Sequence, residues 1–324
     1  MPILEELTER IEQALAELDL PAVPAGLYDP VRYGLEAGGK RFRPCLALMA
    51  AQMFRGETPA SLPTALAMEI FHSFTLVHDD IMDAAPLRRG KASVFKKWDV
   101  NTAILSGDVM LVKAYQLLLQ NTDDVVRPIL AQFSRTAEEV CIGQQMDMDF
   151  ELRASVDMQA YIQMITYKTA VLLGCSLYCG ALSGGAREKD AASLYDAGVQ
   201  LGICFQIQDD LLDAYGNAEK FGKQKGGDIL RNKKTYLTVT AYALAAKDIS
   251  AALHAALNST EMPESEKIEK VIALYDTLQV RQHAQKAMEG YYNNALASLD
   301  AVQVPEDKKI ALRTLASALY DRDH

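Results

Sequence analysis

Residues 71–83 read FHSFTLVHDDIMD, and residues 205–213 read FQIQDDLLD. Each is an apolar stretch with helical spacing that runs directly into three aspartates in the pattern D-D-x-x-D. On a helix, the first and last aspartates of such a motif lie one turn apart on the same face. Unpaired carboxylates at these positions destabilise a helix and are costly to bury, so we expect cations to neutralise each cluster.

Helical spacing recurs along the whole chain, and no convincing run alternates with a period of two. Apolar residues return every three or four positions in 3–18, 104–119 and 268–278. Glycine (19) and proline (11) are scarce for a chain of 324 residues, which argues against a fold with many tight turns. Helix breaks are expected at residues 20–30, 55–63, 84–86, 121–124, 183–185, 215–217 and 261–263. The sequence predicts an all-α fold, a single large helical bundle formed by one domain over residues 1–324.

Composition limits the partners of the chain. Lysine plus arginine (33) and aspartate plus glutamate (43) give a net charge of −10, so nucleic acid and anionic membrane surfaces are poor partners. Five cysteines without a C-x-x-C pair indicate reduced thiols in a cytoplasmic protein. No signal peptide is visible, and the uncharged run 169–186 contains too many small and polar residues for a membrane span. We expect that run to be a buried helix and expect no transmembrane segment.

Basic clusters accompany the aspartate motifs. They lie at 40–43, 88–91, 168 and 223–234. Carboxylate oxygens are hard ligands suited to Mg²⁺, which is usually completed by substrate phosphates, while arginine and lysine bind phosphate directly. One D-D-x-x-D motif could equally be a solvated helix end, but two copies argue against that interpretation. Metal-binding carboxylates surrounded by cations indicate a site for a diphosphate leaving group.

Nine segments resemble, in order, motifs of the trans-isoprenyl diphosphate synthase (polyprenyl synthetase) family. They are GGKRFRP (38–44), HSFTLVHDDIMD (72–83), LRRGK (87–91), ILSGD (104–108), GQQMDM (143–148), YKTA (167–170), FQIQDDLLD (205–213), FGKQKGGD (221–228) and NKKTYL (232–237). The resemblance implies an all-α prenyltransferase, usually a homodimer, with a central apolar cavity between the two aspartate motifs. It also implies head-to-tail condensation of isopentenyl diphosphate with an allylic diphosphate (dimethylallyl, geranyl or farnesyl).

The resemblance assigns roles to individual residues. The expected principal ligands of three Mg²⁺ ions are Asp79, Asp83 and Asp209, supported directly or through water by Asp80, Asp210 and Asp213. The expected ligands of isopentenyl diphosphate are Lys40, Arg43, His72 and Arg89. Those of the allylic diphosphate are Arg88, Lys168, Lys223 and Lys233, with Lys234 an adjacent alternative to Lys233. Lys168, Thr169 and Gln206 are the expected catalytic residues: Thr169 would orient the allylic group, and the Thr169 carbonyl and the Gln206 amide would stabilise the carbocation. Released diphosphate would accept the proton.

Product length is expected to depend on Phe71, Phe74 and Thr75, which precede the first motif. A bulky side chain there would close the space for the growing chain, although both phenylalanines could equally be plain core residues. The C15 members of the family tend to carry two adjacent aromatics here or two extra residues inside the first motif, and this chain has neither. We therefore predict a C20 product, geranylgeranyl diphosphate, with farnesyl diphosphate second and a longer chain third.

Three other functions remain as alternatives. A terpene cyclase would share the fold and first motif, but its second metal motif would differ from DDLLDAYGN at 209–217. A metal-dependent hydrolase using His78 and Asp79 would need more histidines than the five present. A non-catalytic subunit of a prenyl synthase usually lacks some of the six aspartates. One departure from the family pattern is Phe95, where histidine is frequent; it concerns loop packing rather than the metal site.

Overall fold

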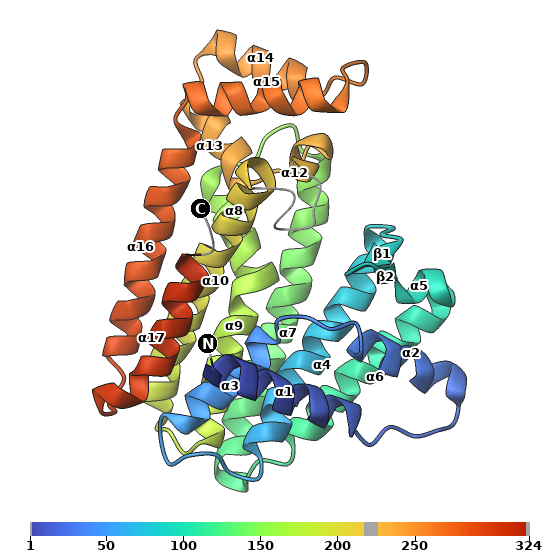
Figure 1. Cartoon of the computed structure of the whole chain (residues 1–324), viewed down its shortest axis with the longest axis vertical. Helices are drawn as coiled ribbons and strands as arrows, with labels where there is room; N and C mark the ends of the chain where they lie inside the picture. The colour runs from blue at the N-terminus through green and yellow to red at the C-terminus, as the bar shows by residue number, and fades with distance from the viewer. Residues whose placement is uncertain (1, 217–225, 322–324) are drawn as a thin grey trace. The chain divides into compact units, whose positions relative to one another are not determined.

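The computed structural model describes residues 2–216 and 226–321, and it confirms the predicted all-α fold (Figure 1). The helices of the first part are α1 (Pro2–Ala16), α2 (Ala25–Leu35), α3 (Phe42–Gln52), α4 (Ser61–Met82), α5 (Val94–Lys97), α6 (Val100–Leu118) and α7 (Asp123–Leu152). Next come α8 (Met158–Ile165), the π-helix η1 (Thr166–Ala170), α9 (Val171–Ser183) and α10 (Glu188–Tyr215). The remaining helices are α12 (Gly227–Leu230), α13 (Tyr236–Leu244), α14 (Lys247–Leu257), α15 (Glu264–Thr277), α16 (Val280–Asp300) and α17 (Glu306–Tyr320).

Three local features differ from the sequence-based prediction. Pro30 lies inside α2 rather than in a break, because this buried residue packs into the core and thereby offsets the one helical hydrogen bond that proline removes. The helix expected over 169–186 starts within η1 and ends at Ser183. A hairpin of two two-residue strands, β1 (Leu87–Arg88) and β2 (Lys91–Ala92), interrupts the helices; such short strands leave no alternating pattern to detect.

The described structure divides into two compact units, each assembled from three chain segments. Unit 1 comprises Met1–Ser134, Cys175–Tyr195 and Val302–Leu312, and unit 2 comprises Arg135–Gly174, Asp196–Ala301 and Arg313–His324. The first aspartate motif therefore belongs to unit 1 and the second to unit 2. A single domain over the whole chain stays a prediction.

Unit 1 is centred on α4, which packs along α6 and α3. Most of α4 is apolar and buried, including Met68, Ile70 and Phe71, so this helix has little polar face to turn toward water. Burying such side chains stabilises the fold by about 1.5–3 kcal/mol each. The consequence for the site is that the last turn of α4, which carries the first aspartates, extends from a firmly packed helix.

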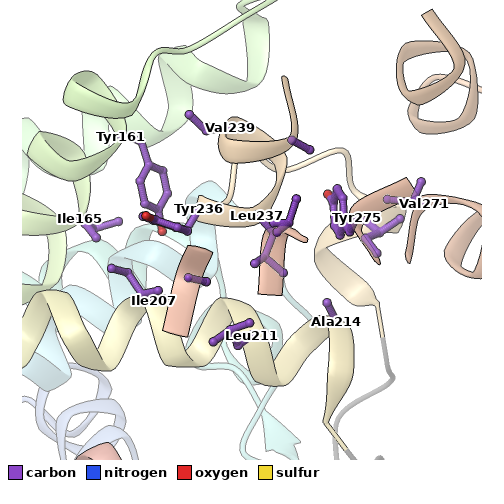
Figure 2. Close-up of a cluster of buried hydrophobic side chains, with 14 of the residues drawn as sticks. Tyr161, Ile165, Ile207, Leu211, Ala214, Tyr236, Leu237, Val239, Val271 and Tyr275 are labelled. Atoms are coloured by element: carbon purple, nitrogen blue, oxygen red, sulfur yellow. The ribbon is translucent and has the colours of Figure 1, made fainter. Parts of the chain in front are cut away.

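Unit 2 has an aromatic core around α8, α10, α13 and α15. Tyr161 and Tyr236 meet edge to face with their ring centres 6.1 Å apart, and Ile165 and Ile207 lie beside them (Figure 2). Buried tyrosine hydroxyls need hydrogen-bond partners. In unit 2, Tyr161 donates to the Asp210 carboxylate, so the core itself reaches into the second aspartate motif.

One stretch, Met158–Ser183, is long and apolar enough to cross a membrane by length and composition alone. It contains most of the uncharged run seen in the sequence. Within it, 78% of the most apolar 18-residue window is buried inside the protein, as in a core helix.

Candidate active site

The first aspartate cluster ends α4, with Asp83 as the C-cap residue. Asp80 is only 3% exposed, and the Arg88 Nε donates to its Oδ1 over 2.7 Å. The same guanidinium contacts Asp79 Oδ2 at 3.2 Å. Burial raises the pKa of Asp80, and the Arg88 hydrogen bond opposes that rise. Arg88 thus offsets part of the negative charge of this cluster.

The motif LRRGK is the β1–β2 hairpin. Leu87 pairs with Ala92 and Arg88 with Lys91, which leaves Arg89 and Gly90 as a two-residue turn with φ of 53° and 78°. Positive φ at both positions is typical of the type I′ turn that matches strand twist. The hairpin therefore holds Arg88 against the aspartates and carries Arg89 at its tip. A small pocket that opens to solvent is lined by residues that include Ser73, Leu76, Asp80, Arg88 and Arg89.

Arg43, on the first turn of α3, meets His72 of α4. The distance from Arg43 Nη1 to His72 Nε2 is 3.2 Å, and because arginine can only donate, this imidazole nitrogen is the acceptor. Burial, and then the charge of Arg43 and neighbouring arginines, lowers the pKa of His72 well below its usual value, so the ring is neutral at pH 7. Burial also lowers the pKa of Arg43 to about 10.

The Arg43 Nε–H is buried and finds no hydrogen-bond partner within residues 2–216 and 226–321. Such an orphaned donor on a charged group is costly unless a ligand completes it. An anion at this position would satisfy the donor and the charge together. Three of the residues predicted to bind isopentenyl diphosphate, Arg43, His72 and Arg89, are therefore brought together electrostatically in unit 1, since Arg89 contributes to both pKa shifts.

The second aspartate cluster lies within α10 and has a different environment. Asp210 is 5% exposed and accepts hydrogen bonds from the Tyr161 hydroxyl, from the Tyr236 backbone N–H at 2.7 Å and from Gln206 Nε2 at 3.2 Å. Burial raises the pKa of Asp210 to about 7 despite these donors. The Tyr236 bond ties the beginning of α13 to α10.

Asp213 ties a second loop to α10. Its Oδ2 accepts from the Asp228 backbone N–H at 2.9 Å, and its carbonyl accepts from Gly226 N–H at 2.7 Å. Lys233 follows, with its own N–H on the Asp228 carbonyl at 2.9 Å. The ammonium of Lys234 contacts the Asn232 carbonyl at 3.4 Å. Lys223 lies outside the described residues.

Lys168 and Thr169 lie on η1, where Val171 N–H bonds to the Thr166 carbonyl five residues back. Single π-turns inside helices are frequent at functional sites. Lys168 forms an ion pair with Asp147 of the GQQMDM segment, and Thr169 Oγ1 donates to Gln206 Oε1 over 3.3 Å. The predicted catalytic residues Thr169 and Gln206 are thus in contact.

The GQQMDM segment begins with Gly143 because α7 passes very close to η1 at this position. A Cβ at this position would lie 2.2 Å from the Lys168 backbone nitrogen, so α7 can pass η1 this closely only without a side chain. Gly107 of ILSGD has a similar role in unit 1. There a Cβ would lie 2.3 Å from His78 Nε2, which contacts the Ile104 carbonyl at 3.0 Å. His78 is therefore held by the backbone of α6.

The three predicted chain-length residues lie in one stretch of α4, residues 71–75. Phe71 is fully buried, with its ring 5.1 Å from that of Phe133, and so behaves as a core residue. Phe74 lies nearer the aspartates, 5.5 Å from Phe71 and 4.8 Å from the His78 ring. The Thr75 hydroxyl donates to the His72 carbonyl at 2.8 Å. Of the two rings, Phe74 is the better placed to limit product length.

The donor chemistry of both clusters fits Mg²⁺. Asp79 is partly exposed and Asp83 exposed on one face of the end of α4, and Asp209 is partly exposed on α10. Among the described residues, no three histidine, cysteine, aspartate or glutamate side chains converge into a ready-made metal cage. Mg²⁺ does not need one, because it binds through one or two carboxylates and completes its shell with water and phosphate.

A family model decides the identity of the chain. The polyprenyl synthetase model matches residues 24–275, which contain both aspartate clusters and every basic segment described above. The chain belongs to the polyprenyl synthetase family. It is therefore an enzyme, a prenyltransferase, as the motifs predicted.

Relatives within the family are similar over most of their length. The chain is 39% identical over 267 residues to a geranylgeranyl diphosphate synthase of Methanosarcina mazei, covering 81% of this chain and 82% of that protein. It is 37% identical over 256 residues to a geranylfarnesyl diphosphate synthase of Natronomonas pharaonis, covering 74% and 75%. A crystal structure of a geranylgeranyl pyrophosphate synthase superimposes with a TM-score of 0.94 and 43% identity over 99% of both chains.

Several residues that organise the site were not assigned from the sequence. Asp147, Gly143 and Gly107 lie inside recognised motifs, so a signal existed although their roles did not follow from it. Tyr161 lies outside the nine motifs, and its role becomes apparent only from its hydrogen bond to Asp210.

Proposed function

We propose that this enzyme condenses isopentenyl diphosphate head to tail with allylic diphosphates, up to farnesyl diphosphate, to form geranylgeranyl diphosphate in the presence of Mg²⁺. The observation that carries the proposal is the buried, unpartnered Arg43 donor beside neutral His72, in the same unit as an aspartate cluster. A terpene cyclase binds one diphosphate and has no use for a second cationic cluster, which here contains Arg43 and Arg89 beside His72.

Unit 1 supplies the isopentenyl side of the reaction. Lys40, Arg43, His72 and Arg89 bind the diphosphate of isopentenyl diphosphate. His72 does so as a neutral ring, because Arg43 and Arg89 hold its pKa down after burial has lowered it. A neutral imidazole leaves the positive charge on the arginines, whose forked donors match phosphate oxygens.

Unit 2 supplies groups for ionising the allylic substrate. Of the residues predicted to bind its diphosphate, unit 2 carries Lys168 and Lys233. Lys234, which contacts the Asn232 carbonyl, is the adjacent alternative to Lys233. Thr169 and Gln206 hold each other in place, so their carbonyl and amide dipoles are oriented before the allylic cation forms.

Mg²⁺ ions held by Asp79, Asp83 and Asp209 would neutralise the allylic diphosphate and stabilise the charge left on its oxygens when the C–O bond breaks. The double bond of isopentenyl diphosphate attacks the cation, and the proton that leaves goes to the released diphosphate. Three ions per site is the number we expect.

The assay that tests the function uses the purified enzyme, Mg²⁺, isopentenyl diphosphate and farnesyl diphosphate, with products separated by chain length. We expect a product one C5 unit longer than farnesyl diphosphate. Release of diphosphate without elongation would indicate a cyclase or hydrolase. Activity only after addition of a second protein would indicate a subunit of a heteromeric synthase.

Product length has its own test. Phe74→Ala removes a ring near the first aspartates, so the main product should lengthen beyond C20, while Phe71→Ala should mainly reduce stability because Phe71 packs on Phe133. Chromatography of the products and thermal denaturation separate the two effects. An unchanged product from Phe74→Ala would show that Phe74 does not limit product length. Because one relative is a geranylfarnesyl diphosphate synthase, C25 is the next product length to consider.

A homodimer is part of the proposal. On α6 and its C-cap, Leu105, Val112 and Leu119 are each more than half exposed and recur every seven residues. An apolar stripe with this spacing suits packing against a second helix. Light scattering should give twice the chain mass, and Leu105→Glu with Val112→Glu should give monomers; a monomeric wild type would contradict the assignment. All five cysteines are free thiols, which agrees with the proposed cytoplasmic location.

A further inference from the structure

Arg41 lies in the sequence between Lys40 and Arg43, the two residues near the start of α3 that we assign to isopentenyl diphosphate. Its own side chain is buried. It is 1% exposed and donates to Glu12 at 2.7 and 3.2 Å, to the Leu35 carbonyl at 2.8 Å and to Glu69. Glu69 is itself 3% exposed on α4. A buried arginine with this many partners is fixed in one position.

The side-chain contacts of Arg41 hold a strained stretch of backbone at the start of α3. Arg41 is the N-cap of α3 and has φ of 48° in the left-handed region, which costs a non-glycine residue about 1–2 kcal/mol. Its carbonyl accepts the first hydrogen bond of α3, from Cys45 N–H at 3.1 Å. The side-chain contacts offset the backbone strain and thereby set where α3 starts. The directions of Lys40 and Arg43 follow from that start.

Glu69 and His72 lie one turn apart on α4, so two connections join α4 to the beginning of α3. Glu69 holds Arg41, and three residues later His72 holds Arg43. Glu69 is also the principal negative charge acting on the pocket: it counteracts the burial that lowers the pKa of Arg43 and of Arg89. The Glu69 carboxylate therefore stabilises the positive charge of three arginines, Arg41, Arg43 and Arg89.

We infer that Arg41 and Glu69 are positioning residues for the isopentenyl diphosphate pocket, acting through the start of α3 rather than by touching substrate. The inference rests on the proposed function, because that function names the ligand of the pocket. It explains why a carboxylate is retained beside a site for an anion, where charge alone would work against binding.

The sign of one substitution separates positioning from plain electrostatics. Glu69→Gln removes a negative charge near a diphosphate site, so charge alone predicts tighter binding of isopentenyl diphosphate. Positioning predicts weaker binding, since Arg41 loses its charged partner and α3 its fixed start. We expect KM for isopentenyl diphosphate to rise about tenfold, with kcat and the KM for farnesyl diphosphate changed by less than about twofold. The variant Arg41→Lys keeps the charge but loses the forked contacts, and should behave similarly.

Two further variants keep the test decisive if Glu69→Gln folds poorly. Glu12 is the more exposed partner of Arg41, so Glu12→Gln should fold and raise the same KM by about threefold. Asp190→Asn is the matched control: this carboxylate is 3% exposed in unit 1 and holds Arg187 and the Gln303 N–H, away from the pocket. It should lower thermal stability and leave every KM unchanged.

Calorimetric measurement of isopentenyl diphosphate binding separates failure of the proposed function from failure of the positioning role. A wild type that binds it but makes no longer product would overturn the proposed function and still allow the variants to be compared by Kd. Unchanged or tighter binding by Glu69→Gln and Arg41→Lys would overturn the positioning role. A wild type that binds no isopentenyl diphosphate would overturn both.

Discussion

The two aspartate motifs have the same spacing and opposite surroundings. In unit 1, Asp79 and Asp80 end a helix and are neutralised by the forked side chain of Arg88. In unit 2, Asp210 lies inside a long helix and is bound by two tyrosine residues and a glutamine. Identical motifs thus stabilise their middle aspartate in different ways, by an ion pair in one and by neutral donors in the other. The spacing shows which carboxylates share a helix face, and the surroundings show how the buried middle aspartate of each motif is stabilised.

The largest effects should separate the proposed metal ligands from the buried middle aspartates. We expect Asp79→Asn, Asp83→Asn and Asp209→Asn each to reduce kcat/KM by about 10³-fold, because each removes a proposed metal ligand. Asp80→Asn and Asp210→Asn should cost about 10- to 100-fold, since these residues position Arg88 and the start of α13. Initial rates at saturating Mg²⁺ measure this. Equal losses for Asp209→Asn and Asp210→Asn would show that the surroundings do not divide the roles.

An intermediate effect should distinguish the two ways of neutralising the middle aspartate. Arg88→Gln leaves Asp80 buried without its cation, so the free energy of unfolding should fall by about 2 kcal/mol, moderated because Arg88 is partly exposed. Urea denaturation without Mg²⁺ measures the loss. The double variant Arg88→Gln with Asp80→Asn should recover most of it. If the single variant were as stable as wild type, the ion pair would not be what makes the buried carboxylate tolerable.

The smallest effect concerns pH and unit 1 alone. The folded-state pKa of His72 lies well below 6.5, chiefly through burial, so the unfolded chain takes up a proton that the folded chain refuses. Stability from this residue is therefore present above pH 6.5 and is lost as pH falls below it. Between pH 6.5 and 5.5 wild type should lose about 1 kcal/mol more than His72→Gln in urea denaturation. Parallel pH profiles for the two proteins would contradict the neutral, buried state of His72.

Much of this molecule could be predicted from its sequence, because its main signals are local. The spacing of Ile104, Leu111 and Leu118 needs only neighbouring residues to indicate a helix, and D-D-x-x-D needs only a helix to bring two carboxylates to one face. A cation was expected at the first cluster, and Arg88, which was predicted to bind the allylic diphosphate, pairs with Asp80 from eight residues further along the chain.

What could not be predicted depends on contacts between distant residues. Asp210 meets Tyr161, 49 residues away, and Arg41 meets Glu69, 28 residues away; no spacing rule joins these pairs. The π-turn at Thr166–Ala170 has no distinctive composition, and its close approach to Gly143 of α7 joins residues more than 20 positions apart. The short hairpin could not be predicted because four strand residues are too few to show an alternating pattern.

The π-turn also has a consequence for how the chain could change over time. A turn closed over five residues instead of four holds one residue more than the α-helix around it, so it is equivalent to a one-residue insertion that the helix has absorbed. A deletion at 166–170 could be accommodated by reverting to ordinary helix, leaving α8 and α9 on their present faces. The same deletion elsewhere in the helix would rotate everything beyond it by about 100°. Lys168 and Thr169 thus lie where length variation is most easily tolerated by the fold and least tolerable for the chemistry.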